Sequence, residues 1–204
     1  MAIFFLVRHG HTALVGNTLA GRLAGIHLNE QGGSQARRLA AELAELPIKA
    51  VYASPLERTQ ETAESIARLH NRPVVVNAGL IELDFGEWQG KSIKQLKRSR
   101  LWKTVQKSPD GFCFPAGESF NQAQSRIVQT LQTLSQTHAE DELVVCVSHC
   151  DPIRLALAYF LGMPLNTFQR LRIDTASVSV LTLSDDTTSF GLINGLTSFS
   201  AYRE

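Results

Sequence analysis

The first apolar run of the chain ends in a cluster of chemically active side chains. Residues 3–7 read Ile-Phe-Phe-Leu-Val, which is too short for a helix and typical of a buried strand. Arg8, His9 and Gly10 follow directly. Glycine allows a sharp turn, a guanidinium is a fixed cationic fork, and an imidazole can act as a nucleophile. Since α/β folds carry their sites at the carboxyl ends of strands, this opening predicts such a site, although a turn with a solvated arginine also fits it.

Strands and helices alternate along the rest of the chain. Apolar runs predict strands at 50–53, 74–76, 143–147 and 177–183, with 190–193 as the partner of the last. Helical spacing predicts helices after Asn29, after Ser54, from Phe120 to Leu134 and after Asp151. Ser54 and Asp151 each precede a proline, which favours them as N-terminal caps with the proline at the first helical position. This alternation predicts a three-layer α/β sandwich.

Length and composition favour an ordinary globular domain. A chain of 204 residues can bury one large core, and none of its apolar runs is long enough to span a bilayer. The opening run lacks a basic region before it and is no signal peptide, so we expect a cytoplasmic protein. Three cysteines form an odd and sparse set that favours free thiols. A net charge of +1 gives no indication of nucleic acid or a membrane as a partner.

Residues 91–118 form a segment of unusual composition. Seven basic residues and no acidic one lie between Lys91 and Lys107, and prolines and glycines follow. A run of this kind fits a solvated helix face, and it also fits a basic cap over an anionic substrate. We therefore expect a single domain over residues 1–204 with an inserted cap or lid at about 91–118.

Four groups of residues recur at the ends of predicted strands or the starts of helices: 8–10, Arg58, Glu82 and His149. In this order they resemble the histidine phosphatase superfamily, also called the phosphoglycerate mutase-like family. The segments 28–32, 86–90 and 115–119 echo spacers of that family, and the resemblance runs from Phe4 to about Arg154. It implies an α/β/α sandwich with a mostly parallel central sheet.

The resemblance assigns catalytic roles to five residues, and the chemistry suits their types. Arg8 and Arg58 would grip phosphate oxygens with planar forks, which lysine would do only as a point charge. His9 would attack phosphorus as a neutral imidazole and form a phosphohistidine. His149 would serve as a positively charged donor to the phosphoryl group. Glu82 would be the general acid, kept protonated by burial or by the bound phosphate, and Asp84 is the alternative for this role.

Two departures from the family pattern affect the predicted phosphate site. His11 follows Gly10, where relatives often carry Glu or Gln, and Val15 stands where they often place an asparagine. We expect additional substrate or phosphate contacts from Thr12, Asn17, Arg22 and Cys150.

Other chemistries fit the sequence less well. His149-Cys150 is separated from Arg154 by three residues, whereas cysteine phosphatases need five, and Asp151 would repel phosphate there. His9 and His11 flank one glycine, but no further spaced pair completes a metal site, so we expect no metal or cofactor.

The sequence thus predicts a metal-independent phosphatase that acts through phospho-His9 on a small anionic phosphorylated metabolite. Mutase-type phosphoryl transfer and a non-catalytic phospholigand-binding protein stay open as alternatives. The oligomeric state is open between a monomer and a homodimer.

Overall fold

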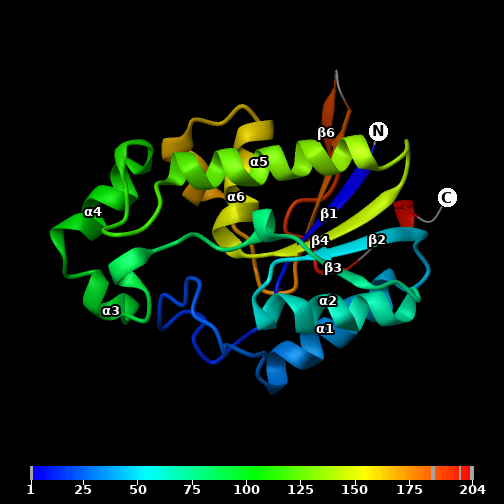
Figure 1. The fold of residues 1–204 in the computed structure, drawn as a ribbon, viewed down its shortest axis with the longest axis horizontal. Helices are drawn as coiled ribbons and strands as arrows, with labels where there is room; N and C mark the ends of the chain where they lie inside the picture. Colours follow the sequence, from blue (N-terminus) through cyan, green and yellow to red (C-terminus); the bar gives the residue numbers. More distant parts are fainter. Residues whose placement is uncertain (1, 185–186, 198, 203–204) are drawn as a thin grey trace.

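The structure is a computed structural model that describes residues 2–184, 187–197 and 199–202 (Figure 1). Within them a six-stranded sheet has the order β3-β2-β4-β1-β5-β6. Its strands are β1 (Ala2–Arg8), β2 (Ile48–Ala53), β3 (Val74–Val76), β4 (Leu143–Ser148), β5 (Val178–Leu183) and β6 (Thr188–Phe190). The first four strands run parallel, while β5 is antiparallel to β1 and β6 is antiparallel to β5. The predicted mostly parallel sheet is confirmed.

Helices cover both faces of the sheet (Figure 1). One face packs against α1 (Glu30–Leu43) and α2 (Glu57–Leu69), and the other against α5 (Phe120–Thr137) and α6 (Cys150–Phe160). Side chains of β1 alternate between the two cores: Phe4 and Leu6 join the core of α5 and α6, and Phe5 and Val7 join that of α1 and α2. This is the three-layer sandwich that the sequence predicts.

The parallel strands bring three chain segments to one edge of the sheet. Arg8 of β1 lies opposite Ser148 of β4, and Ala53 of β2 lies opposite Val147 of β4. The residues that follow these strands therefore emerge together, as expected for the carboxyl ends of a parallel sheet.

Two helices begin elsewhere than the sequence predicts. Helix α2 starts at Glu57 with Leu56 as its cap. The Ser54 hydroxyl lies 2.8 Å from the Nε2 atom of His149 and accepts from the Leu56 N–H at 3.4 Å, so it does not cap α2. In α6 the cap is His149, whose backbone is extended. Pro152 is the third helical residue, where its missing N–H is of no consequence because the first turn has no intrahelical acceptors for it.

The segment 91–118 lies at one end of the sandwich (Figure 1). It contains α3 (Ile93–Leu96) and α4 (Arg100–Lys107). It carries two short helices where the sequence predicts one, followed by a 3₁₀ turn at Pro109–Gly111. Leu96 and Val105 are buried, whereas all seven basic side chains between 91 and 107 are exposed. The basic run is therefore a solvated face.

Shorter elements complete the chain. The predicted strand or extended loop at 80–85 is a loop that follows the 3₁₀ turn Ala78–Leu80, and further 3₁₀ turns lie at Gly86–Trp88, Leu165–Arg170 and Ser200–Tyr202. The partner of β5 ends at Phe190, where it pairs with Leu181, so the prediction of a strand at 190–193 is wrong. No helix among the described residues combines the length and apolarity that a bilayer crossing requires.

Candidate active site

A cavity of about 240 Å³ lies where β1, β2 and β4 end. Six of the nine site residues predicted from the sequence line it: Arg8, His9, Thr12, Arg58, Glu82 and Cys150. The other three, Asn17, Arg22 and His149, lie outside the lining. The fold thus gathers residues that are up to 142 positions apart, from position 8 to position 150, around one space.

Tight backbone packing produces the turn that presents His9. A Cβ atom on Gly10 would lie 2.6 Å from the carbonyl oxygen of Gly32, and one on Gly32 would lie 2.0 Å from that of His11. The Gly10 N–H also donates to the Thr62 hydroxyl at 3.0 Å. Glycine at both positions therefore lets the first turn of α1 lie directly against the chain after β1.

His9 is built as a neutral base. Its Nδ1 atom lies 2.7 Å from the Gly10 carbonyl oxygen, which can only accept, so Nδ1 carries the proton and Nε2 keeps its lone pair. Burial, together with the positive charges of Arg58 and Arg8, lowers the pKa of His9 to about 3. The imidazole is therefore unprotonated at neutral pH and chemically suited to nucleophilic attack.

The two arginines leave buried nitrogen atoms without partners. Arg58 NH2 donates to the Gly21 carbonyl at 2.7 Å, and Arg8 NH1 donates to the Ile173 carbonyl at 2.7 Å. Arg58 NH1, Arg8 Nε and His149 Nδ1 are buried and have no hydrogen-bond partner among the described residues. Unpaired buried nitrogens on two cations beside a cavity are what an oxyanion site requires, because each would cost free energy without an acceptor.

His149 lies behind His9, with 5.2 Å between the ring centroids, and is fully buried. Burial lowers its pKa well below the ordinary value, and Arg58, His9 and Arg8 add to the effect. The predicted role of His149 as a positively charged donor to a bound phosphoryl group therefore stays a prediction, because it concerns the protein with phosphate in place. A phosphate dianion between Arg8 and Arg58 would offset their charge and raise the pKa of His149 again.

Glu82 is held partly protonated near neutral pH. Burial, helped by the nearby negative charge of Asp151, raises its pKa to about 7. The Leu83 N–H, which donates to Glu82 Oε1 at 3.0 Å, and the charge of Arg58 oppose this shift. Such a carboxyl group can both give and take a proton near pH 7. Asp84, the alternative acid, does not line the cavity.

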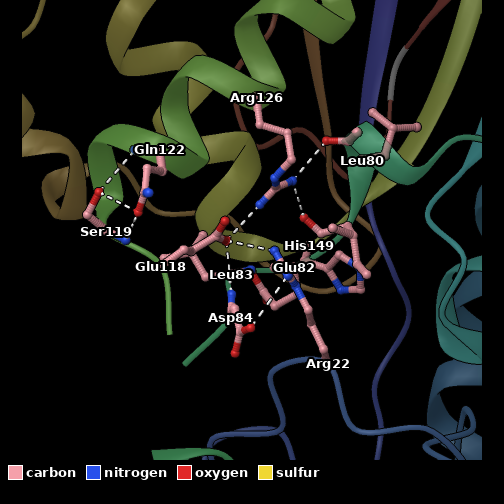
Figure 2. Close-up of polar contacts among 12 residues, drawn as sticks. Arg22, Leu80, Glu82, Leu83, Asp84, Glu118, Ser119, Gln122, Arg126 and His149 are labelled. Atoms are coloured by element: carbon pink, nitrogen blue, oxygen red, sulfur yellow. Dashed lines mark hydrogen bonds and ion pairs between the residues drawn. The ribbon is translucent and has the colours of Figure 1, made fainter. Parts of the chain in front are cut away.

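Arg22 supports the loop that carries Glu82 (Figure 2). Its Nε atom donates to the Glu82 carbonyl at 2.8 Å, and its NH2 atom donates to Glu118 Oε1 at 2.9 Å. The same Glu118 oxygen accepts from Arg126 NH2 at 2.8 Å and from the Asp84 N–H at 2.9 Å. The structure therefore gives Arg22 a partner in the protein where the sequence predicts a substrate contact.

The remaining predicted contacts differ in their surroundings. Thr12 is buried in the lining, and its hydroxyl accepts from the Leu14 N–H at 3.4 Å. Asn17 is exposed, and its carbonyl accepts from the Ile93 N–H at 2.9 Å. Cys150 lines the cavity, but burial raises its pKa to about 12, so it is a thiol and a poor nucleophile.

Two charged lining residues were missed as site residues: Asp151 and Arg154. Arg154 NH1 contacts Asp151 Oδ1 at 3.2 Å, and Arg154 Nε donates to the Leu171 carbonyl at 2.7 Å. Their sequence signal is the spacing of three residues near the start of α6, which begins at Cys150. The described residues contain no group of three or more His, Cys, Asp or Glu side chains arranged to hold a metal ion.

Comparisons with known proteins agree with this geometry. The family model described as "Histidine phosphatase superfamily (branch 1)" matches residues 4–195. Phosphoserine phosphatase 1 of Hydrogenobacter thermophilus is 32% identical over 190 residues, which cover 91% of this chain and 88% of that one. A 2,3-bisphosphoglycerate-dependent phosphoglycerate mutase of Thermoplasma acidophilum is 31% identical over 186 residues, covering 89% and 87%. The solved structure of Bacillus stearothermophilus YhfR superposes with a TM-score of 0.87 at 25% identity, covering 94% and 96%. The chain therefore belongs to the histidine phosphatase superfamily, as the resemblance in its sequence implies.

Proposed function

We propose that this chain is a metal-independent phosphomonoester phosphatase that forms a phosphohistidine at His9. The observation that carries the proposal is the state of His9: a neutral imidazole with its Nε2 lone pair available, between two guanidiniums that have unpaired buried nitrogens. Phosphoryl transfer depends mainly on positioning and on neutralising charge, and this arrangement supplies both. The relative named phosphoserine phosphatase 1 supports the same reaction class.

The first half of the reaction transfers the phosphoryl group to the enzyme. His9 Nε2 forms a bond to phosphorus while the bond between phosphorus and the ester oxygen breaks. Arg8 and Arg58 bind the phosphoryl oxygens and offset the charge that develops on them. The proton of Glu82 passes to the departing oxygen, which leaves as an alcohol.

The second half regenerates the enzyme. Glu82, now a carboxylate, takes a proton from water while the water oxygen forms a bond to phosphorus. The bond between phosphorus and His9 then breaks, and inorganic phosphate and neutral His9 result. A pKa of about 7 suits Glu82 for both directions of proton transfer near neutral pH.

Mutase-type transfer is the alternative that uses the same intermediate. A mutase passes the phosphoryl group to a second acceptor and must exclude water, which calls for more enclosing chain than residues 91–118 supply. Because one relative is named as a phosphoglycerate mutase, mutase activity is one of the outcomes of the test.

The test is hydrolysis of an aryl phosphate in the presence of EDTA by the wild type, by His9→Ala and by His27→Ala. His27 is an exposed imidazole and serves as the matched control. We expect the wild type and the control to release phosphate at similar rates and His9→Ala to be inactive. Activity that requires added metal, or that survives in His9→Ala, would contradict the proposal. Phosphoglycerate interconversion that exceeds phosphate release would favour the mutase, and tight phosphate binding without turnover would favour a binding protein.

A further inference from the structure

A second, smaller cavity adjoins the candidate active site. It measures about 60 Å³ and shares three lining residues with the phosphate cavity: Leu19, Phe85 and Asp151. Since one water needs about 10–15 Å³ of such volume, the smaller cavity has room for roughly four or five non-hydrogen atoms. We call it the aromatic pocket, because Phe85, Trp88, Trp102, Phe114 and Phe120 line it with Val105.

The 91–118 segment contributes an apolar wall to this pocket. Trp102 and Val105 of α4 line it together with the uncharged Gln106, and the Trp102 ring stacks on Trp88 with 6.1 Å between centroids. None of the basic side chains between 91 and 107 lines either cavity. The hypothesis of a cationic cap over the substrate therefore gives way to an apolar roof next to the phosphate cavity.

Asp151 is the charged member of the three residues that line both cavities. It is the second residue of α6, and its side chain is 22% exposed. Arg154 holds its Oδ1 atom at 3.2 Å, while Oδ2 has no partner among the described residues. The charge of Asp151 also reaches Glu82, whose pKa it raises. Arg154 therefore holds one oxygen of the Asp151 carboxylate, and the other oxygen is available to accept a hydrogen bond from a ligand near Glu82.

The alcohol that leaves a phosphomonoester has to lie in the part of the phosphate cavity next to Glu82. Glu82 protonates the ester oxygen in the proposed reaction, so the carbon atoms attached to that oxygen lie next to Glu82. Where the phosphate cavity meets the aromatic pocket, the residues that line both are Leu19, Phe85 and Asp151. An ammonium or hydroxyl group on those carbons can donate to Asp151, whereas a carboxylate would meet a like charge.

We propose that Asp151 and the aromatic pocket form a leaving-group subsite. The subsite favours phosphomonoesters of uncharged or cationic alcohols with a short apolar body, and it disfavours esters that carry a carboxylate next to the ester carbon. The preference deepens the proposed phosphatase function and depends on it.

The test for Asp151 compares two esters of equal chain length, O-phosphoethanolamine and 2-phosphoglycolate, in the wild type, Asp151→Asn and Glu87→Gln. Glu87 is an exposed carboxylate outside both cavities and is the matched control. We expect wild-type kcat/KM to favour the cationic ester and Asp151→Asn to reduce that ratio by on the order of tenfold. Because both esters use the same general acid, a changed pKa of Glu82 cancels in the ratio.

The test for the aromatic pocket compares n-butyl phosphate with methyl phosphate in Trp102→Ala and in Leu101→Ala. Leu101 is an exposed residue of the same helix and is the control. We expect the preference for the butyl ester to fall by roughly tenfold in Trp102→Ala alone, the equivalent of losing one or two buried methylene contacts.

The outcomes separate the two proposals. A 2-phosphoglycolate preference in the wild type, or ratios that Asp151→Asn and Trp102→Ala leave unchanged, would overturn the subsite and leave the phosphatase standing. If the wild type hydrolyses the aryl phosphate in a His9-dependent way but none of the four esters, the subsite is overturned and the phosphatase stands. If His9-dependent hydrolysis is absent with the aryl phosphate as well, the proposed function is overturned and the subsite with it.

Discussion

Arg22 donates a 2.8 Å hydrogen bond from Nε to the main-chain carbonyl of Glu82 and at the same time an ion-pair hydrogen bond of 2.9 Å to Glu118 (Figure 2). Glu118 in turn binds Arg126 on α5 and the Asp84 N–H. The loop that carries the candidate general acid is therefore tied on both sides by charged hydrogen bonds. We expect Glu118 to be a positioning residue for Glu82.

Removal of the Glu118 carboxylate should reduce the hydrolysis rate most for esters with poor leaving groups. An alkyl ester needs the proton of Glu82 when its oxygen departs, whereas p-nitrophenolate leaves without one. For Glu118→Ala we expect kcat to fall by about 100-fold with an alkyl phosphate and by less than about fivefold with p-nitrophenyl phosphate, in line with the usual contribution of general acids. Glu64→Gln, which removes an exposed carboxylate on α2, should change neither rate. Equal losses on both substrates would indicate a merely structural role.

The activity towards alkyl esters should fall as the pH rises through about 7. Glu82 has a raised pKa of about 7, and only its protonated form can donate to the departing oxygen. We expect the descending limb of the kcat/KM profile to follow this ionisation and to disappear in Glu82→Gln, whose residual rate is low and pH-independent in that range. A descending limb that persists in Glu82→Gln would assign the ionisation to another group.

The buried neutral state of His9 should make the protein sensitive to acid. Its pKa is lowered to about 3 in the fold from an ordinary 6.5, so below pH 6.5 the unfolded chain binds a proton that the folded chain rejects. Stability is therefore lost as the pH falls from about 6.5 towards 3. At pH 5 this single group accounts for about 2 kcal/mol. Urea unfolding at pH 7 and pH 5 should show a smaller loss for His9→Asn than for the wild type, and equal losses would contradict the expected state of His9.

Gly10→Ala should destabilise the fold and misplace the nucleophile. The added Cβ atom would lie 2.6 Å from the Gly32 carbonyl oxygen, so the chain after β1 has to move away from α1. We expect a loss of about 1–3 kcal/mol in unfolding free energy, as for other overpacked sites, together with a fall in kcat. Gly111→Ala is the control, because a Cβ atom there meets nothing within 4 Å. Similar unfolding curves for the two variants would contradict the packing argument.

Strong local patterns made the framework predictable. The apolar runs of β1 and β4 are uninterrupted, and a histidine follows each strand directly. The helical spacing from Phe120 onwards marks α5 equally well, and the structure adds a capping box of Ser119 and Gln122 at its start. The gathering of Arg8, His9, Arg58 and Glu82 follows from parallel strands that end at one edge.

Tertiary contacts decided the features that the sequence did not predict. Ser54 looks like a helix cap, but its hydroxyl is engaged by His149, which is 95 residues away in the sequence. Arg22 looks like a substrate contact, but the Glu82 carbonyl and Glu118 take its guanidinium. The basic side chains of 91–107 suggested a cationic cap over the substrate, whereas Trp102 and Val105 of α4 line a cavity. A single residue type does not reveal which of several partners it will meet.

The most direct test of the account is to trap the phosphorylated enzyme. The wild type is mixed with a fast aryl phosphate in EDTA, quenched within milliseconds under alkaline conditions that preserve phosphohistidine, and digested for mass spectrometry. We predict one phosphoryl group per chain on His9 and none in His9→Ala. A phosphoryl group on Cys150 or another residue, or phosphate release with no labelled chain at any time, would contradict the account.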